Sequence, residues 1–295
     1  MRNCPACGAN GGRPAGVKSD FPFVRCGTCA TLYTPNIPAG ESLHSLYADY
    51  YGEANLTAPE FVSQRLDEIA ATFAPYRKNN RLLDVGFGAG TLLHAAKRAG
   101  WNAGGTEASE RAVAQAAAQG FDVRVCVQLT DARYDSASFD VVTAVELLEH
   151  IIDPSALLRE IARILRPGGL LWATTPHGRG ISARLLGTKW SVVSPPEHLQ
   201  LFSVRGMRQL LGRAGLRPLH LATHGVNPYE IAHCLFHKDQ PFDRVATSYA
   251  LNAALSERPS RRALKNALNR MLSATRLGDG LKVYAVAGEE SPHTV

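Results

Sequence analysis

The sequence predicts a doubly wound α/β protein, in which a mostly parallel sheet carries helices on both faces. From residue 81 onward, short apolar segments alternate with segments of helical composition, which is the pattern of repeated β-α-β units. A glycine-rich turn separates the first of these predicted strands from the helix that follows it. The 295 residues, 45% hydrophobic and 20% charged, suffice for a globular core without disulfides and exclude a disordered or fibrous chain.

Before this sheet, four of the six cysteines form two CxxC pairs within the first 29 residues. The spacing between the pair Cys4 and Cys7 and the pair Cys26 and Cys29 is typical of four-thiolate zinc sites. Four protein ligands leave no open coordination position, so the predicted zinc ion is structural. Residues 1–40 are therefore expected to form a zinc ribbon. Reduced thiols and a redox pair are the alternatives, and two pairs at ribbon spacing argue against the redox pair.

A helix is predicted over residues 60–76, because apolar side chains recur there at helical spacing and the pattern ends at Pro75. Residues 41–78 are accordingly expected to form a linker and a lid helix. Tyr50 and Tyr51 are candidates for a lid over a ligand, with ordinary core packing as the alternative.

Seven apolar segments predict the strands of the main domain, residues 79–295. A helix over 157–165 is expected to stop at Pro167-Gly168-Gly169. The last strand follows a long helix and is expected to be antiparallel. The predicted strands are residues 81–85, 101–106, 123–127, 139–143, 170–174, 216–222 and 281–287.

The glycine turn reads GFGAG and begins at Gly86, directly after the first predicted strand. Glycines let a ligand approach the backbone closely. The second predicted strand ends in Glu107, whose carboxylate can accept hydrogen bonds from both hydroxyls of a ribose. Together the two features predict a nucleotide-like ligand at the carboxyl end of the sheet. A nicotinamide dinucleotide is the competing ligand, but its GxGxxG pattern differs from the GxGxGT found here.

The main domain closely resembles the class I S-adenosylmethionine (SAM)-dependent methyltransferases in four blocks: LLDVGFGAGTLL, the strand-end Glu107, FDVVTAVELLEHIIDP and LLREIARILRPGGLLWATTP. The resemblance covers residues 80–220 and keeps the family's order and spacing. It implies a seven-stranded Rossmann-like sheet of the methyltransferase type, with the last strand antiparallel. A further segment, PPEHLQLFSVRGMRQLLGRAGL, is similar to the subgroup that methylates small molecules in biosynthesis. Phe87 departs from the family, which often has Cys there, and this should alter packing more than function.

By the same resemblance, SAM would be bound by residues near the carboxyl ends of the first four strands. Asp84 and the glycine turn would hold its amino-acid end, although Asp84 is equally explained as an acceptor for backbone donors in the turn. Glu107 would hold the ribose, and the adenine would lie between Ala108 and the loop after the third strand. Val145 would back the methionine part. The full set is Asp84, Gly86, Phe87, Gly88, Gly90, Glu107, Ala108, Gln128, Leu129 and Val145.

A catalytic base is needed only if the acceptor atom loses a proton in the reaction. Glu146, Glu149 and His150 form an ExxEH segment, which resembles the divalent-ion segment of quinone-pathway O-methyltransferases. The simpler reading is that Glu149 and His150 cap and orient the loop beneath the cofactor. The candidates for the base are His150, His177 and His198, with Glu197 beside the last.

The predicted function is SAM-dependent methylation of a small molecule, with oxygen as the expected acceptor atom. Residues 177–205 and 225–278 are expected to be insertions that cap the acceptor. The first alternative is an RNA methyltransferase that grips phosphates with the ribbon and a basic helix. Against it, the ribbon carries few cations: Arg2, Arg13, Lys18 and Arg25. The second alternative is a catalytically silent SAM-binding scaffold.

The net charge of +6 is weak support for an anionic partner, because the charge is spread along the chain. No apolar stretch approaches the roughly 18 residues that span a bilayer, and the N-terminus lacks the apolar core of a secretion signal. The expected location is the cytoplasm, and nucleic acid is not the expected partner. The sequence does not predict an oligomeric state.

Overall fold

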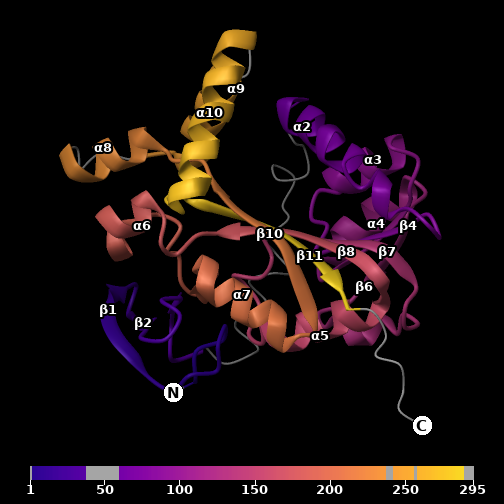
Figure 1. Ribbon diagram of the computed structural model, residues 1–295, viewed down its shortest axis with the longest axis horizontal. Helices are drawn as coiled ribbons and strands as arrows, with labels where there is room; N and C mark the ends of the chain where they lie inside the picture. Colours follow the sequence, from indigo (N-terminus) through magenta and orange to yellow (C-terminus); the bar gives the residue numbers. More distant parts are fainter. Residues whose placement is uncertain (1, 38–59, 237–241, 256–257, 289–295) are drawn as a thin grey trace. The chain divides into compact units, whose positions relative to one another are not determined.

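The computed structural model describes residues 2–37, 60–236, 242–255 and 258–288 (Figure 1). The candidate lid residues Tyr50 and Tyr51 lie outside this part of the chain. The chain divides into two compact units. The ribbon unit holds Met1–Ile37, Thr175–Gln209 and Leu221–Lys282, and the sheet unit holds Pro38–Thr174, Leu210–His220 and Val283–Val295.

Seven strands of the described residues form one sheet, in the order β10-β11-β8-β7-β4-β5-β6. Neighbouring strands from β8 to β6 pair in parallel, and the last strand, β11, is antiparallel. This order confirms the predicted Rossmann-like fold of the methyltransferase type. The strands are β4 (Arg81–Val85), β5 (Asn102–Glu107), β6 (Asp122–Val125), β7 (Phe139–Val145), β8 (Leu165–Pro176), β10 (Leu216–His224) and β11 (Gly280–Ala287).

Two helices of the sheet unit, α4 and α5, begin at residues whose side chains cap them. Ser109 accepts a hydrogen bond from the Ala112 amide at the start of α4, and Asp153 does the same for Ala156 at the start of α5. Figure 1 shows α2, α3 and α4 gathered on one side of the strands, with α5 on the other. Their bounds are α2 (Glu60–Ala71), η2 (Ala74–Tyr76), α3 (Thr91–Arg98), α4 (Glu110–Ala118), η3 (Leu129–Ala132) and α5 (Pro154–Ile164).

The core of the sheet unit lies between the strands and α2 to α4. Phe73 and Trp172 are buried there with ring centroids 5.8 Å apart, and Leu82, Leu93 and Val141 have no exposed surface. Each such side chain contributes roughly 1.5–3 kcal/mol by leaving water. This core fixes β4 and α3, and with them the turn that joins the two elements.

The helix predicted over 157–165 ends one residue earlier than expected, at Ile164 with Leu165 as its C-cap, so Pro167-Gly168-Gly169 lies beyond the helix end and not at it. This helix is α5, and β8 starts at the residue after it. The glycines instead form an irregularity inside β8, where the register with β7 shifts between the pairs Phe139↔Leu165 and Val141↔Leu170. Gly168 has a φ of +70°, which glycine adopts without strain. The glycines therefore produce a local bend, but that bend lies within strand β8.

The ribbon unit is built around a second sheet. Four strands of its described residues pair in the order β1-β2-β3-β9, and Figure 1 shows β1 and β2 next to the N-terminus. The strands are β1 (Gly12–Lys18), β2 (Phe21–Cys26), β3 (Leu32–Tyr33) and β9 (Gln200–Leu201). The helices are α6 (Ile181–Leu185), η4 (Gly187–Lys189), α8 (Pro228–Phe236), α9 (Arg244–Ala254) and α10 (Pro259–Thr275), and α7 (Val204–Arg213) continues into the sheet unit.

Candidate functional site

The glycine turn after β4 has a left-handed backbone at three positions. The φ angles are +67° at Gly86, +55° at Gly88 and +72° at Gly90, where the turn enters α3. A Cβ atom at Gly86 would lie 2.9 Å from Leu147 Cδ1, so a side chain there meets both backbone strain and a steric clash. The turn therefore has no side chain at these three positions at the carboxyl end of β4, and its Gly86 and Gly90 amides donate to the carbonyls of Thr106 and Phe87.

Glu107 ends β5, the strand next to β4, and its carboxylate faces the turn. Its Oε2 atom accepts a hydrogen bond of 3.0 Å from the Gly88 amide. Its Oε1 atom accepts from the amides of Ala108 and Ser109, at 2.7 and 3.2 Å. The side chain is 7% exposed. The structure thus brings the predicted acidic residue and the predicted glycine turn into direct contact.

Asp84 lies inside the sheet unit, one residue before the end of β4. Burial raises the pKa of this carboxyl group to about 7, and a hydrogen bond from Thr143 on β7 acts in the opposite direction. The Thr143 hydroxyl donates to Asp84 Oδ1 at 2.7 Å. The alternative explanation of Asp84 was that it accepts hydrogen bonds from backbone amides of the glycine turn. The donor in this bond is instead a side chain of the neighbouring strand. Sequence reasoning missed Thr143, although it stands in the register opposite Asp84.

The other residues expected to hold SAM follow the ends of β5, β6 and β7. Ala108 is half-buried directly after Glu107, and Val145 is the last residue of β7. Leu129 is buried at the start of η3, whereas the side chain of Gln128 is exposed. Because parallel strands end at the same edge of a sheet, these residues share that edge with the glycine turn.

The ExxEH segment follows β7. Glu149 is fully buried, and its Oε1 atom lies 4.0 Å from His150 Nε2. Glu146 is exposed and has a φ of +47°, and its amide donates to the Thr174 carbonyl. Within the described residues, Glu146 does not lie close enough to the other two to share a metal ion with them. The segment therefore does not present its three side chains as one ligand set.

The two later histidines belong to the ribbon unit. His177 follows β8, is 1% exposed, and its Nδ1 atom contacts the Gly278 carbonyl at 2.8 Å. His198 contacts the Val192 carbonyl through Nδ1. A carbonyl oxygen only accepts, so Nδ1 carries the hydrogen in both rings and Nε2 carries the lone pair. Burial lowers the pKa of His177 to about 4 and also lowers the pKa of His198.

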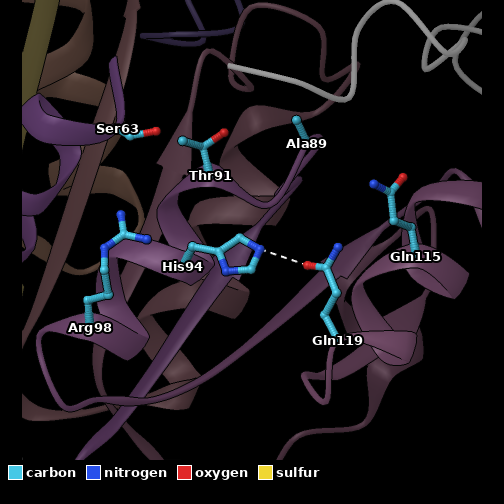
Figure 2. Close-up of a pocket in the computed structure, with 7 residues that line it drawn as sticks. All are labelled: Ser63, Ala89, Thr91, His94, Arg98, Gln115 and Gln119. Atoms are coloured by element: carbon cyan, nitrogen blue, oxygen red, sulfur yellow. Dashed lines mark hydrogen bonds between the residues drawn. The ribbon is translucent and has the colours of Figure 1, made fainter. Parts of the chain in front are cut away.

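A polar cavity of about 190 Å³ lies between α2, α3 and α4 (Figure 2). His94 Nε2 and Gln119 Oε1 meet across it at 2.7 Å. It is smaller than the 300 Å³ or more typical of ligand pockets. None of the residues predicted to bind SAM lines it; its lining consists of Ser63, Ala89, Thr91, His94, Arg98, Gln115 and Gln119.

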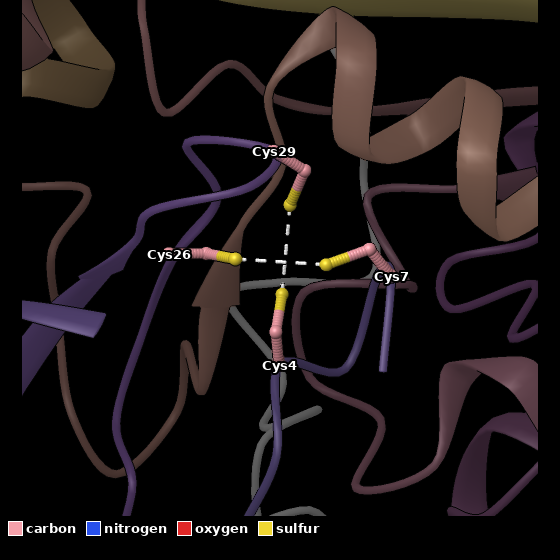
Figure 3. A group of neighbouring side chains, drawn as sticks. All are labelled: Cys4, Cys7, Cys26 and Cys29. Carbon is pink, nitrogen blue, oxygen red and sulfur yellow. Dashed lines mark hydrogen bonds between the residues drawn. The ribbon is translucent and has the colours of Figure 1, made fainter. Parts of the chain in front are cut away.

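The four ribbon cysteines point at a common centre (Figure 3). The Sγ atoms of Cys4 and Cys29 are 3.5 Å apart, as are those of Cys7 and Cys26, and all four lie within 4.8 Å of one another. A tetrahedral zinc ion with Zn–S bonds of about 2.3 Å requires sulfurs about 3.8 Å apart. The cluster therefore fits one zinc ion with four thiolate ligands.

The strand order, the glycine turn and the strand-end carboxylate define a class I SAM-dependent methyltransferase. Residues 57–221 match the family model described as a methyltransferase domain. Since this match covers more than half of the chain, the chain belongs to that family.

Named relatives and a solved structure agree with this assignment. The chain is 32% identical to a ubiquinone biosynthesis O-methyltransferase of Ralstonia nicotianae, over 59% of this chain and 77% of that protein. It is 36% identical to the 27-O-demethylrifamycin SV methyltransferase of Amycolatopsis mediterranei, over 45% of this chain and 50% of that protein. The fold is shared with a SAM-dependent methyltransferase from Archaeoglobus fulgidus, with a TM-score of 0.52 and 16% identity over 79% and 96% of the two chains. No helix within the described residues is long and apolar enough to cross a membrane.

Proposed function

We propose that this enzyme transfers the methyl group of SAM to an oxygen atom of a small molecule in a biosynthetic pathway. The observation that carries the proposal is the contact between Gly88 and Glu107, which joins the two halves of a nucleoside site. The two named relatives, one in ubiquinone biosynthesis and one acting on a rifamycin, support oxygen as the acceptor atom and a small molecule as the substrate.

The sheet unit supplies the proposed SAM site. The glycine turn and the buried Asp84 hold the amino-acid end, and Glu107 accepts hydrogen bonds from the ribose. Ala108, together with the loop at Gln128 and Leu129, flanks the adenine, and Val145 backs the methionine part. These residues fit SAM, because a glycine turn and a carboxylate that is hydrogen-bonded to it suit a ligand with an adenosyl group.

When bound, SAM supplies a methyl group that is already activated by its positive sulfur. The chain then has to hold the acceptor in line with that group and exclude water. Residues 177–205 and 225–278 are the proposed acceptor segments. Of the candidate bases, His177 and His198 have the required form, since burial keeps each ring neutral and leaves the lone pair on Nε2. His198 is the less buried of the two and is the preferred base.

Zn²⁺ is the second proposed ligand, held by Cys4, Cys7, Cys26 and Cys29. The ion fills a closed four-thiolate site and stabilises a short segment that has little core of its own. No step of the methyl transfer involves it.

The proposed function is tested by incubating the protein with SAM labelled in the methyl group and a fractionated cell extract. Label is expected in small molecules, as a base-stable ether or an ester, and not in RNA or protein. Label confined to RNA would replace the proposal with the nucleic-acid alternative. SAM binding without label in any fraction would indicate a catalytically silent protein.

A further inference from the structure

The cysteine ribbon shares its sheet with a segment from the middle of the chain. Strand β3 pairs with β9 in the register Leu32↔Leu201 and Tyr33↔Gln200, and the Thr34 amide donates to the Leu199 carbonyl at 3.0 Å. Strand β9 lies inside residues 177–205, the first of the two proposed acceptor segments. The ribbon is therefore continuous, through backbone hydrogen bonds, with the part of the chain proposed to bind the acceptor.

The proposed metal site is also in contact with residues 203–206, at the end of this acceptor segment. The Ser203 hydroxyl donates to the carbonyl of Cys29, a proposed zinc ligand, and accepts from the Gly206 amide at 2.8 Å. A Cβ atom at Gly206 would lie 3.3 Å from Cys29 Sγ and would collide with the Thr31 hydroxyl. The first turn of α7 thus begins directly against the knuckle that holds Cys29.

Three of the four ribbon cations are bonded to backbone carbonyls of this segment. Arg2 donates to the Leu199 carbonyl at 2.9 Å, and Arg25 donates to Gly178 at 2.9 Å. Lys18 Nζ donates to the Trp190 carbonyl at 2.9 Å. An RNA-binding ribbon would direct these charges outward at phosphates, whereas here they are directed at residues 178–199.

Lys18 also forms one side of a clamp on a single peptide group. The peptide group between Trp190 and Ser191 presents its oxygen to Lys18, and its amide donates to Glu230 Oε1 at 2.9 Å. Glu230, on α8, is 1% exposed. A cation at the oxygen and an anion at the amide both align with the peptide dipole, so the two charges reinforce each other.

Apolar packing connects the same elements. Phe23 and Leu32 of the ribbon share a buried cluster with Leu186, Trp190 and Val193, and the side chains of Ile231 and Cys234 on α8 pack against it. The Val192 carbonyl, beside this cluster, is the acceptor for His198 Nδ1. Contacts therefore run from the ribbon, through the peptide groups at 190–192, to the preferred base.

We propose that the metal-loaded ribbon positions the acceptor segment, with Lys18 as a positioning residue that holds the 190–198 stretch in one conformation. The inference rests on the proposed function, which assigns residues 177–205 to the acceptor. It assigns the ribbon a role within its own chain and not in RNA binding. Loss of the metal would release Phe23, Leu32 and Lys18 together, because a segment this short depends on its metal for folding.

Hydrogen–deuterium exchange on the full chain tests the inference without a known acceptor. Removal of Zn²⁺ with a chelator is expected to accelerate amide exchange about tenfold over 178–203, as local opening does, and to leave 81–145 unchanged. Readdition of Zn²⁺ alone should restore the protection. Unchanged exchange over 178–203, or equal loss of protection in both regions, would overturn the inference.

Variants of the metal-loaded protein provide the second test. Lys18→Met is expected to accelerate exchange over 189–198 several-fold, and Lys18→Arg should largely restore protection because it keeps a donor for the Trp190 carbonyl. Arg13→Met is the matched control, since Arg13 lies exposed on the same strand and should have no effect. Equal effects of Lys18→Met and Arg13→Met would contradict the assignment of Lys18.

A kinetic measurement separates positioning from general stability. The methyl-accepting extract fraction serves as the probe, and Lys18→Met should lower the maximal labelling rate, because the loosened stretch carries His198, while the SAM affinity stays within about twofold. A maximal rate equal to that of the wild type, or a SAM affinity that falls together with the rate, would contradict a positioning role. If no fraction accepts label but the exchange results hold, the proposed function fails while the metal-dependent ordering of this segment stands.

Discussion

Glu107 and Gly88 are joined across two neighbouring strands by a hydrogen bond of 3.0 Å from the Gly88 amide to Glu107 Oε2. The carboxylate that would bind the ribose therefore also fixes the glycine turn that would bind the rest of SAM. Residues 19 positions apart in the sequence act as one unit, since β4 and β5 pair in parallel and end at the same edge.

Glu107→Gln tests this relationship directly. The substitution keeps the shape of the side chain but removes its charge and one acceptor oxygen, so SAM binding should weaken by about 1.5–3 kcal/mol, the scale of a hydrogen bond to a charged group. Titration calorimetry measures the change. Glu110→Gln, exposed in the first turn of α4, is the control and should leave the affinity unchanged. Equal affinities for wild type and Glu107→Gln would remove Glu107 from the site.

Asp84→Asn is expected to change how stability depends on pH. The folded-state pKa of about 7 lies above the usual value of 3.8, so the folded protein binds an extra proton between these pH values. Stability should therefore fall as pH rises from about 4 to 7, by at most about 1.4 kcal/mol per pH unit from this group. The Asn variant lacks this contribution.

Urea denaturation of both proteins at several pH values between 4 and 7 measures the difference. His177, whose pKa is lowered to about 4, contributes the opposite slope in both proteins, so it cancels when the two curves are subtracted. Parallel curves for wild type and Asp84→Asn would contradict the raised pKa of Asp84.

The sequence was sufficient for the parts of the fold that local rules determine. The glycine turn, Glu107 and the strand over 81–85 follow from residue types at short spacing, and the structure brings Gly88 and Glu107 together as the pattern requires. Two features depend on pairing between distant segments and could not be predicted in this way. Strand β9 has only two residues and exists because β3 lies beside it, and the hydroxyl of Thr143 reaches Asp84 only through the register of β7 with β4.

Arg166 and Arg98 offer a contrast between a buried and an exposed ion pair. Arg166 Nε lies 2.6 Å from Asp140, whose side chain is fully buried and also accepts from the amides of Lys78 and Asn79. Arg166→Met leaves that carboxylate without its cation and should destabilise the protein by about 3–5 kcal/mol. Arg98→Met breaks a pair with Asp67 in which the two side chains are 51% and 42% exposed, and should cost at most about 1 kcal/mol. Chemical denaturation that gives equal losses for the two variants would contradict the assigned burial.

The cluster of four ribbon cysteines predicts the zinc content of the protein. Elemental analysis of protein purified without chelator should find one zinc ion per chain, and Cys29→Ser should lower that content because it removes one of four ligands. Cys126→Ser is the matched control, since Cys126 lies on the sheet unit after β6 and outside the cluster. Wild-type protein without zinc, or a loss of zinc in Cys126→Ser, would show that the four ribbon cysteines are not the site.

The assignment of His198 as the base predicts how activity depends on pH and on this side chain. Neutral imidazole is the active form, and burial lowers the pKa of His198 below its usual 6.5, so activity should fall to half only at a pH below 6.5. His198→Gln removes the lone pair on Nε2 and should lower kcat by about 10²- to 10⁴-fold, the range of general acid–base catalysis, with unchanged SAM affinity. His220→Gln, at an exposed position of β10, is the control. If the His198→Gln variant keeps full activity, the acceptor reaches the methyl group already ionised or His177 removes its proton, and His177→Gln distinguishes these two cases because only the second predicts a loss.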